Sequence, residues 1–517
     1  MDTPDSVTSD SASKHVSLTD EHSPLHLRPR SQNPSALNQQ ISPIRLLLSV
    51  GGGLICTFLF LRAIVLEPFG VPTGSMAPAL IGHHRQGICP RCDFLVRVGF
   101  PPAGVSPETH YQTVACPNCG SLFSMANERD LNGDRLLVDK NIFHLRKPRR
   151  WEMAVFHCPD TDPKEQGKPY VKRVVGLPGE TILISNGEVY ANQQLLRKNI
   201  AEVRETRFLN CDLNHIPRPF GWRNRWLIDE YDARLPIAAQ QLPRLADDEI
   251  LNGGTLHLNA DPQVTVTATY RNWNLDHQNE EPIRAWNSYD GLPRSFGKLP
   301  LVHEFSIECD VQITHVTPNA AIVWRLTDGI QTVSVRMTPG VNTLGEISFQ
   351  VDGVESFPSI REESLRSGGK YHVEYAFFDR RVLLAINGQV VGKSLDLPPI
   401  ESAQEVCRPF SVSVQGCKLV LSNFKLYRDL YYTQYGMNGT LPPGRPVTLD
   451  SDEYFLLGDN SDNSQDSRKW LVPGVPETAF IGKPFLVHQP LRAARVTIGG
   501  RERIIQTIDW SRLRWLH

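Results

Sequence analysis

The chain lacks any excess of basic residues, since 54 Lys and Arg stand against 56 Asp and Glu and the net charge is -2. Without such an excess, binding to nucleic acid is not expected. The ten cysteines also lack the even spread of a small disulfide scaffold, because four of them form two tight pairs. With 517 residues, 40% of them hydrophobic, the chain can build several cores of its own.

The N-terminal region has no hydrophobic periodicity over residues 1–44, which are rich in Ser, Asp and Pro. We therefore predict a disordered cytoplasmic tail there. An apolar run follows from Leu46 to Leu66 and, at about 1.5 Å per residue, a helix of this length would span roughly 30 Å. The sequence thus predicts a transmembrane helix over residues 45–66.

Two alternatives to a retained anchor are a cleavable signal peptide and a buried soluble helix. The polar segment before the run is longer than a signal peptide's usual first region, and the run has no polar face. Arg28, Arg30 and Arg45 precede the run, so the positive-inside rule places the N-terminus in the cytoplasm. The rest of the chain would then lie outside the cytoplasm.

Three separated stretches carry candidate chemistry. Ser75 lies in the Gly-containing turn Val71–Pro78, and Lys172 lies among apolar residues in the strand-like stretch Tyr170–Val175. A polar loop, Gly458–Arg468, follows far downstream. A serine hydroxyl needs a base to become a nucleophile, and burial lowers the pKa of a lysine from its usual value of about 10.4, which makes it a usable base.

The order of these motifs resembles that of type I signal peptidases, the membrane-bound Ser/Lys proteases that remove signal peptides. Five stretches in sequence order carry the resemblance: Pro72–Met76, Gly133–Lys140, Arg150–Phe156, Tyr170–Glu180 and Gly458–Arg468. The resemblance covers residues 46–200 and 428–517, and it implies a catalytic domain of coiled antiparallel β-sheets. Ser461 departs from the arginine that is common at its position.

The resemblance also implies a role for each matching residue and no cofactor in the reaction. Ser75 would be the nucleophile and Lys172 its general base, while the Ser75 N–H and the Thr73 hydroxyl would bind the oxyanion. Residues expected to support the site are Asp459, Ser464, which would hydrogen-bond the lysine, and the ion pair of Asp466 with Arg468.

The implied substrates are exported preproteins with small residues at the first and third positions before the cut. They would lie along an exposed strand edge close to a lipid bilayer. The expected location is the bacterial inner membrane, with a single span and the catalytic domain outside the cytoplasm.

A cysteine-rich insert is expected over about residues 86–125. Cys89 and Cys92 form one C-x-x-C pair, and Cys116 and Cys119 form a second pair after 23 intervening residues. Four thiolates at such spacing suit a tetrahedral structural zinc site, as in a zinc ribbon. Two disulfides are the alternative, because this region is expected outside the cytoplasm.

A larger insert over residues 201–427 separates the two catalytic parts, 67–200 and 428–517. Alternating apolar and polar residues with turn signals predict many strands, among them 255–258, 264–270, 409–415 and 418–427. We predict an all-β sandwich that resembles concanavalin-like jelly rolls. A carbohydrate partner is one option, with Trp273, Trp286 and Trp324 as candidate stacking residues, at least one of which is expected in the core. A role as a spacer or in substrate access is the preferred interpretation of this insert.

The sequence is also compatible with two rival functions. The chain could be a membrane-anchored carbohydrate-binding protein with a decayed peptidase core, although the Ser, Lys and Gly-Asp-Asn motifs are intact. It could also be a Ser/Lys autoprotease of the repressor-cleaving type, which would be soluble.

Overall fold

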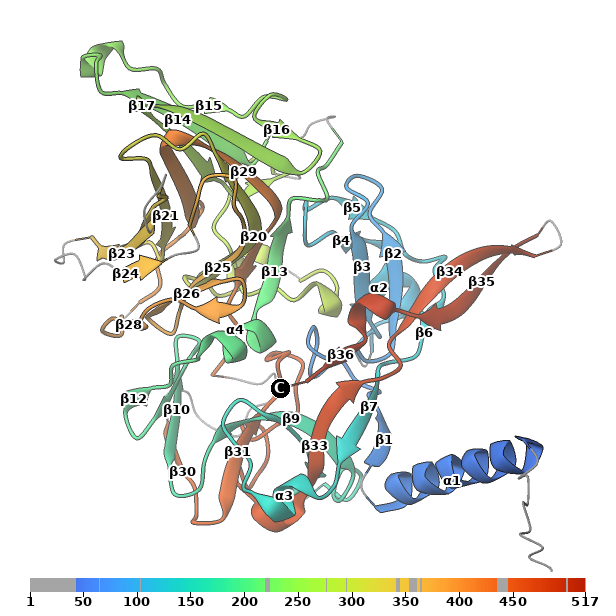
Figure 1. The fold of residues 1–517 in the computed structure, drawn as a ribbon. Coiled ribbons are helices and arrows are strands. Elements are labelled where there is room, and N and C mark those ends of the chain that lie inside the picture. The colour runs from blue at the N-terminus through green and yellow to red at the C-terminus, as the bar shows by residue number, and fades with distance from the viewer. Residues whose placement is uncertain are drawn as a thin grey trace, which may run out of the picture. The chain divides into compact units, whose positions relative to one another are not determined.

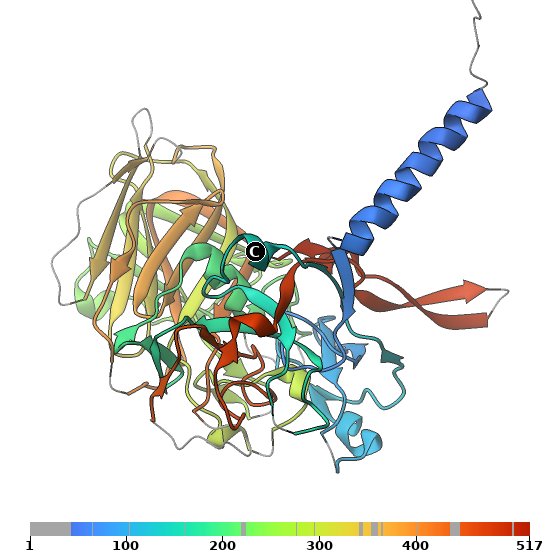
Figure 2. The same ribbon diagram turned by 90° about the horizontal axis from the view of Figure 1, so that it is seen from below.

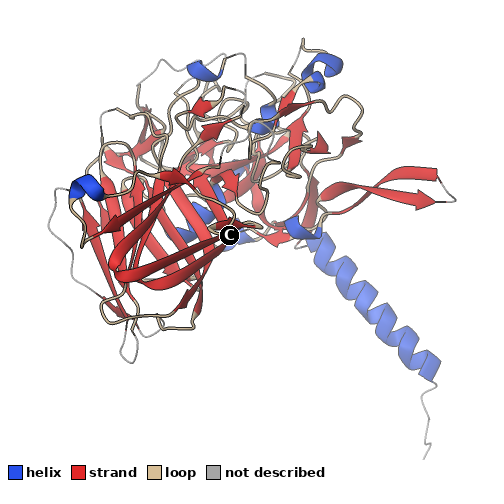
Figure 3. Ribbon diagram, turned by 90° about the horizontal axis from the view of Figure 1, so that it is seen from above, coloured by secondary structure: helices blue, strands red, loops and turns tan. Residues whose placement is uncertain are grey.

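A computed structural model describes residues 43–516 except 65, 103, 161, 219–223, 276, 294, 341–344, 353–359, 363–364, 401, 435–444 and 499–500. Among these described residues there are 36 strands and only four α-helices, so the predicted mostly-β fold class is confirmed (Figure 3). The tail predicted over residues 1–44 lies almost entirely outside the described part of the chain.

Helix α1 (Pro43–Ile64) has 22 residues and coincides with most of the apolar run. In the described part of the chain, however, no helix has the combination of length and apolar character needed to cross a membrane. The transmembrane helix predicted over residues 45–66 is therefore not confirmed.

The sheet that carries the candidate base has eight strands, in the order β1-β7-β33-β8-β9-β31-β32, with β36 paired to β33. Strand β8 is buried on both faces, because alternate side chains of a strand point to opposite sides. Met153 and Val155 enter one apolar core, and Ala154 and Phe156 enter another. The strands are β1 (Leu66–Gly70), β7 (Arg135–Asp139), β8 (Met153–His157), β9 (Pro169–Gly176), β31 (Glu453–Leu457), β32 (Val475–Pro476), β33 (Phe480–Val487) and β36 (Arg514–Trp515).

Four small sheets accompany this one, and a fifth, made of β18 (Trp273–Asn274) and β19 (Asn279–Glu280), lies between residues 208 and 428. Figure 2 shows the longest of their hairpins, β34 and β35, as a ribbon of two antiparallel strands. The members are β10 (Thr181–Ser185), β11 (Glu188–Ala191), β12 (Gln194–Leu195) and β30 (Val447–Thr448); β2 (His84–Ile88), β3 (Leu95–Gly99) and β6 (Asp130–Leu131); β4 (Val114–Ala115) and β5 (Leu122–Phe123); and β34 (Leu491–Ile498) and β35 (Arg501–Ile508).

The part of the chain between residues 208 and 428 forms a connected network of fifteen strands around one large apolar core (Figure 1). Its strands are β13 (Phe208–Asp212), β14 (Trp226–Asp232), β15 (Arg244–Leu245), β16 (Leu251–Asn252), β17 (Thr255–Tyr270), β20 (Phe305–Thr314), β21 (Ala321–Thr327), β22 (Thr332–Thr338), β23 (Gly345–Val351), β24 (Ile360–Glu362), β25 (Lys370–Phe378), β26 (Arg381–Ile386), β27 (Gln389–Val390), β28 (Leu395–Asp396) and β29 (Phe410–Arg428).

Two long strands of this network correct the predicted strand boundaries. Residues 255–258 and 264–270 belong to the single strand β17, whose register against β29 shifts between Ala260 and Thr265. Residues 409–415 and 418–427 likewise fall in or beside the single strand β29, which contains Gly416 at a φ of 64°. The chain bends at these points without ending its ladder, because a bulge or a glycine absorbs the irregularity.

The strands that open and close this network lie side by side. Phe208, in β13, pairs with Arg428, at the end of β29. A segment whose two ends are close together can be accommodated without disturbing the sheet that it interrupts. The remaining short elements are α2 (Pro107–Gln112), α3 (Ile142–Leu145), α4 (Ile200–Thr206), η1 (Ile237–Ala239), η2 (Ser288–Asp290), η3 (Phe296–Lys298), η4 (Glu477–Ala479) and η5 (Trp510–Arg512).

Candidate active site

Ser75 lies in a compact turn between β1 and β2. The turn is closed by backbone hydrogen bonds from Ala77 N to the Gly74 carbonyl, at 3.0 Å, and from His83 N to the Pro72 carbonyl, at 3.1 Å. Ser75 is only 8% exposed. Ser75 therefore lies on the buried side of a turn that is held by its own hydrogen bonds.

Lys172 reaches this serine from the middle of β9. Its Nζ donates a hydrogen bond of 2.6 Å to Ser75 Oγ, although the two residues are 97 positions apart. Ala154 is the residue opposite Lys172 on β8, and its small side chain leaves room on that face for the lysine. The structure thus brings together the two residues singled out as nucleophile and base.

Lys172 is 3% exposed, and burial lowers the pKa of its amine to about 8 even though Asp466 and Asp459 act in the opposite direction. At pH 7 about a tenth of such amines are uncharged, compared with roughly one in 3,000 for a lysine with an ordinary pKa. Lys172 can therefore accept a proton from the hydroxyl at neutral pH.

The next residue, Arg173, belongs to a separate buried ion pair. Its guanidinium donates to both carboxylate oxygens of Asp459, at 2.8 and 2.6 Å, and to the Trp151 carbonyl. Although burial opposes it, Asp459 raises the pKa of Arg173. Because successive strand residues point to opposite sides, this pair fixes β9 to the loop after β31 while Lys172 faces the serine.

The loop after β31 carries the predicted supporting residues. Asp466 and Arg468 form a fully buried ion pair at 2.6 Å, and Asp466 also accepts a hydrogen bond from Gly458 N. Ser464 is completely buried, but within the described part of the chain its hydroxyl forms no hydrogen bond with Lys172. The expected hydrogen bond from Ser464 to Lys172 is therefore not present in this structure.

Thr73 lies on the open side of the turn. It is exposed, and its Oγ1 is 3.5 Å from Ser75 Oγ, at the outer limit of a hydrogen bond. A hydroxyl can rotate, so Thr73 Oγ1 is able to donate a hydrogen bond to a group placed beside Ser75 Oγ.

Asn460 makes contacts with the turn of Ser75 that the sequence does not predict. Its backbone N–H donates to the Ser75 carbonyl at 3.0 Å, and its side-chain Nδ2 donates to the Gly74 carbonyl at 3.1 Å. Asn460 therefore holds the nucleophile turn from the loop side. The position of Asn460 next to Asp459 in the recognised motif was the one available signal.

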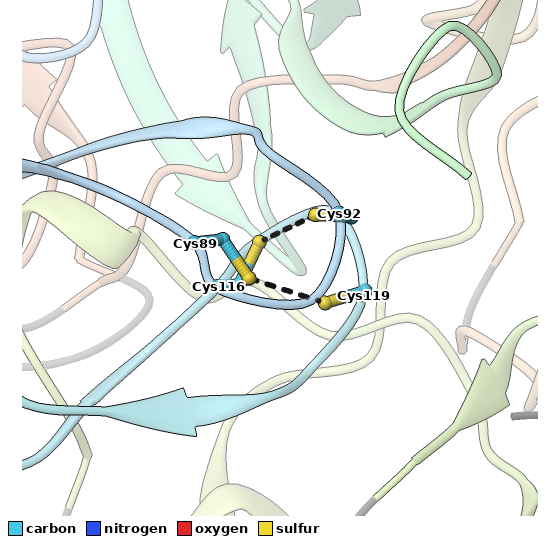
Figure 4. A group of neighbouring side chains, drawn as sticks. All are labelled: Cys89, Cys92, Cys116 and Cys119. Carbon is cyan, nitrogen blue, oxygen red and sulfur yellow. Dashed lines mark hydrogen bonds between the residues drawn. The ribbon is translucent and has the colours of Figure 1, made fainter. Parts of the chain in front are cut away.

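The four cysteines of the predicted insert converge from β2–β3 and β4–β5 (Figure 4). Their Sγ atoms all lie within 4.8 Å of one another, with Cys89 to Cys119 at 3.7 Å and Cys92 to Cys116 at 3.6 Å. Tetrahedral zinc with bonds of about 2.3 Å requires S···S separations of about 3.8 Å. A disulfide requires about 2.05 Å. The four buried sulfurs therefore fit a metal and are not arranged as two disulfides.

The three tryptophans considered for carbohydrate stacking have different surroundings. Trp324 is fully buried in the core of the fifteen-stranded network, and Trp273 is 5% exposed. Neither side chain can therefore stack on a sugar at the surface. Trp286 is half-buried and lines a cavity of about 200 Å³ next to Asn460 and Asn463.

Comparison with known proteins gives a family match in two segments, which extend into both ends of the fifteen-stranded region between residues 208 and 428. Residues 122–247 and 381–488 match the family described as "Signal peptidase, peptidase S26". The "Signal peptidase I" of Leptolyngbya laminosa is 42% identical over 71 residues, which are 13% of this chain and 34% of that protein. The "Probable signal peptidase I-2" of Synechocystis sp. is 39% identical over 67 residues, which are 13% of this chain and 31% of that protein.

Among solved structures, the carbohydrate-binding module CBM66 from Bacillus subtilis is similar over 39% of this chain and 94% of its own, with 10% identity and a TM-score of 0.21.

The present chain spans about a third of the length of the two signal peptidases named above. Lys172 and the loop Asp459–Arg468 lie within the residues matched to the S26 family, and Ser75 lies before them. The chain is thus similar to signal peptidases of family S26 in two segments, which the residues from 248 to 380 separate.

Proposed function

We propose that the chain is a serine endopeptidase that removes signal peptides from exported preproteins with a dyad of Ser75 and Lys172. The observation that carries the proposal is the 2.6 Å hydrogen bond between Lys172 Nζ and Ser75 Oγ, made by two buried side chains. The pKa of about 8 for Lys172 gives the amine the basicity that such a reaction needs near neutral pH.

In the first half of the reaction, Ser75 Oγ attacks the carbonyl carbon of the scissile bond and Lys172 Nζ takes the hydroxyl proton. The negative charge that develops on the carbonyl oxygen is stabilised by the Ser75 N–H and the Thr73 hydroxyl. Lys172 then passes the proton to the departing amine, the C–N bond breaks, and an ester remains on Ser75.

In the second half, water replaces the departed amine. Lys172 takes a proton from the water as the water oxygen attacks the ester carbonyl, and Ser75 leaves with that proton. The products are the cut signal peptide with a free carboxylate and the mature chain with a free amine. Every proton in this cycle is handled by Lys172, so neither half can proceed without it.

The test is cleavage of a preprotein by purified full-length chain, with Ser75→Ala and Lys172→Ala as the disabling variants. Ser306→Ala is a matched serine control, because its buried hydroxyl has no hydrogen-bond partner in the described part of the chain. We expect no cleavage from either dyad variant and full cleavage from the control. Cleavage at the wild-type rate by a dyad variant would contradict the proposal.

The location predicted from the sequence, the bacterial inner membrane, is a separate prediction. Fractionation of cells that produce the full chain tests it. Recovery of the protein with the membranes supports the predicted location, and recovery with the soluble proteins contradicts it.

A structural zinc ion at the four cysteines is a second part of the proposal. The residues that would hold it are Cys89, Cys92, Cys116 and Cys119, which are all buried and offer four sulfurs. The ion would tie β2–β3 to β4–β5 and would leave no open position for a substrate, so it would contribute to folding and not to the reaction.

A further inference from the structure

A short segment of the middle region (residues 208–428), Asn287–Asp290, lies directly against the turn that holds Ser75, the nucleophile turn. We call it the docking segment; it contains η2, and the Asn287 side chain accepts a hydrogen bond from Tyr289 N at its start. In sequence it is about 210 residues from the turn that it contacts. The middle region is therefore in direct contact with the turn that holds Ser75.

Asn287 and Tyr289 contact the turn that holds Ser75. Asn287 Nδ2 donates to the Ala77 carbonyl at 3.1 Å, and Tyr289 OH donates to the His83 carbonyl at 2.9 Å. Tyr289 is 4% exposed and packs with Ala77 in a small apolar cluster. A Cβ added at Gly74 or at Gly99 would overlap the Tyr289 ring, so the glycine beside Ser75 is one of two that leave room for this ring.

Asp290 contacts the other side of the turn through Asn460. One of its carboxylate oxygens, Oδ1, accepts hydrogen bonds from Asn460 Nδ2 at 2.8 Å and from Asn463 Nδ2 at 2.9 Å. Asn460 in turn donates to the carbonyls of Gly74 and Ser75. A continuous path of hydrogen bonds thus runs from Asp290 to the backbone of the nucleophile.

We propose that the docking segment is a positioning element for Ser75, in which Asp290 orients Asn460 and Tyr289 supports the turn at Gly74. This inference rests on the proposed function of the dyad. Burial raises the pKa of Asp290 to about 6, so the carboxylate is mostly ionised at pH 7. Hydrogen bonds to an ionised carboxylate are stronger than those between neutral groups, so Asp290 can fix a side-chain amide that would otherwise rotate. Reaction rates depend steeply on such placement, because a shift of about 1 Å can cost about 100-fold.

Asp290→Ala and Asp290→Asn form a matched pair for the test. Alanine removes the accepting oxygen, whereas asparagine keeps one carbonyl oxygen that can accept from both Asn460 and Asn463. With a preprotein substrate, we expect Asp290→Ala to lower kcat about tenfold with KM changed less than about twofold, since positioning affects the reaction and not the binding. Asp290→Asn should keep kcat within about threefold of wild type.

Tyr375→Phe controls for general damage to the middle region. Tyr375 is fully buried in the core of the same region, and its OH donates to the Val333 carbonyl at 2.8 Å, as Tyr289 OH does to the His83 carbonyl. This variant loses one comparable hydrogen bond away from the turn, and we expect a wild-type kcat. Equal kcat losses in Asp290→Ala and Tyr375→Phe, or an unchanged kcat in Asp290→Ala, would overturn the inference.

Hydrogen exchange supplies a readout that does not depend on activity. The amides of Ala77, Leu80 and His83 are hydrogen-bonded within the turn. We expect faster exchange in a peptide spanning residues 73–83 for Asp290→Ala, and unchanged exchange there for Tyr375→Phe. If the wild-type chain cleaves nothing, the proposed function fails, and this exchange measurement still decides the positioning role: unchanged exchange in Asp290→Ala would refute it.

Discussion

The pKa of Lys172 predicts how the rate of cleavage varies with pH. The amine must be uncharged to take the proton from Ser75, and burial lowers its pKa to about 8. The value of kcat/KM should therefore rise tenfold per pH unit below pH 8 and level off above it. At pH 6 it should be about 1% of the plateau.

The direction of the pH dependence follows from which protonation state of Lys172 is active. Protonation at low pH removes the base, so activity is lost as the pH falls through the pKa, and the high-pH form is fully active until another group titrates or the chain unfolds. A lysine with an ordinary pKa of about 10.4 would instead place the midpoint more than two pH units higher. The displacement of the midpoint thus reports how strongly the folded chain disfavours the ammonium.

The assay is initial-rate cleavage of a peptide that has small residues at the first and third positions before the cut and no group titrating between pH 5.5 and 10. Near-ultraviolet circular dichroism at each pH checks that the chain stays folded. A midpoint close to 6.5, typical of histidine, or a flat profile across this range would refute the assignment of Lys172 as the base.

Three further predictions concern the structure around the dyad. Asp459→Ala should lower the free energy of unfolding by about 3–5 kcal/mol in urea titrations, because it leaves Arg173 buried without its partner; a loss below about 1 kcal/mol would contradict the buried pair. Cys116→Ser should reduce the zinc content measured by mass spectrometry from one ion per chain to none, and wild-type protein free of zinc would contradict the site. Gly74→Ala and Tyr289→Ala should be coupled by about 0.5–3 kcal/mol in a double-mutant cycle, because the new methyl group and the ring compete for one space; strictly additive effects would contradict that contact.

The sequence predicted the parts of the site that depend on local pattern. Ser75 was recognisable within a Gly-containing turn and Lys172 within an apolar strand, and the structure places the two in contact. Asp466 and Arg468, separated by one residue, were expected to pair and do so. Such residues can be predicted from the sequence because the motif that contains each one spans only a few positions.

The contacts made across long sequence distances were not predictable in this way. The docking segment carries no pattern of its own, since Asn287–Asp290 looks like an ordinary polar turn until folding brings it to Ala77. Trp324 was a candidate for sugar stacking because its exposure could not be read from the sequence. In β21 it points into the core, as the alternation of that strand requires.

The predicted boundaries of β17 and β29 were wrong for a related reason. Pro262 and Gly416 lie between stretches that the sequence predicts as separate strands, and residues of these two types usually mark turns. In the structure β17 and β29 continue through them, because each strand is paired along both halves by neighbouring strands. The tertiary ladder thus overrides the local signal for a turn.

The central claim, that Ser75 attacks the scissile carbonyl, is tested most directly by trapping the ester on that serine. Preprotein and full-length chain are mixed, quenched in acid within the first turnover, and digested for mass spectrometry. We expect the peptide containing Ser75 to carry the mass of the cut signal segment, and Ser75→Ala to yield no such adduct. Cleavage by the wild-type chain with the adduct on another residue, or with no adduct under conditions where hydrolysis of the ester is slowed, would contradict it.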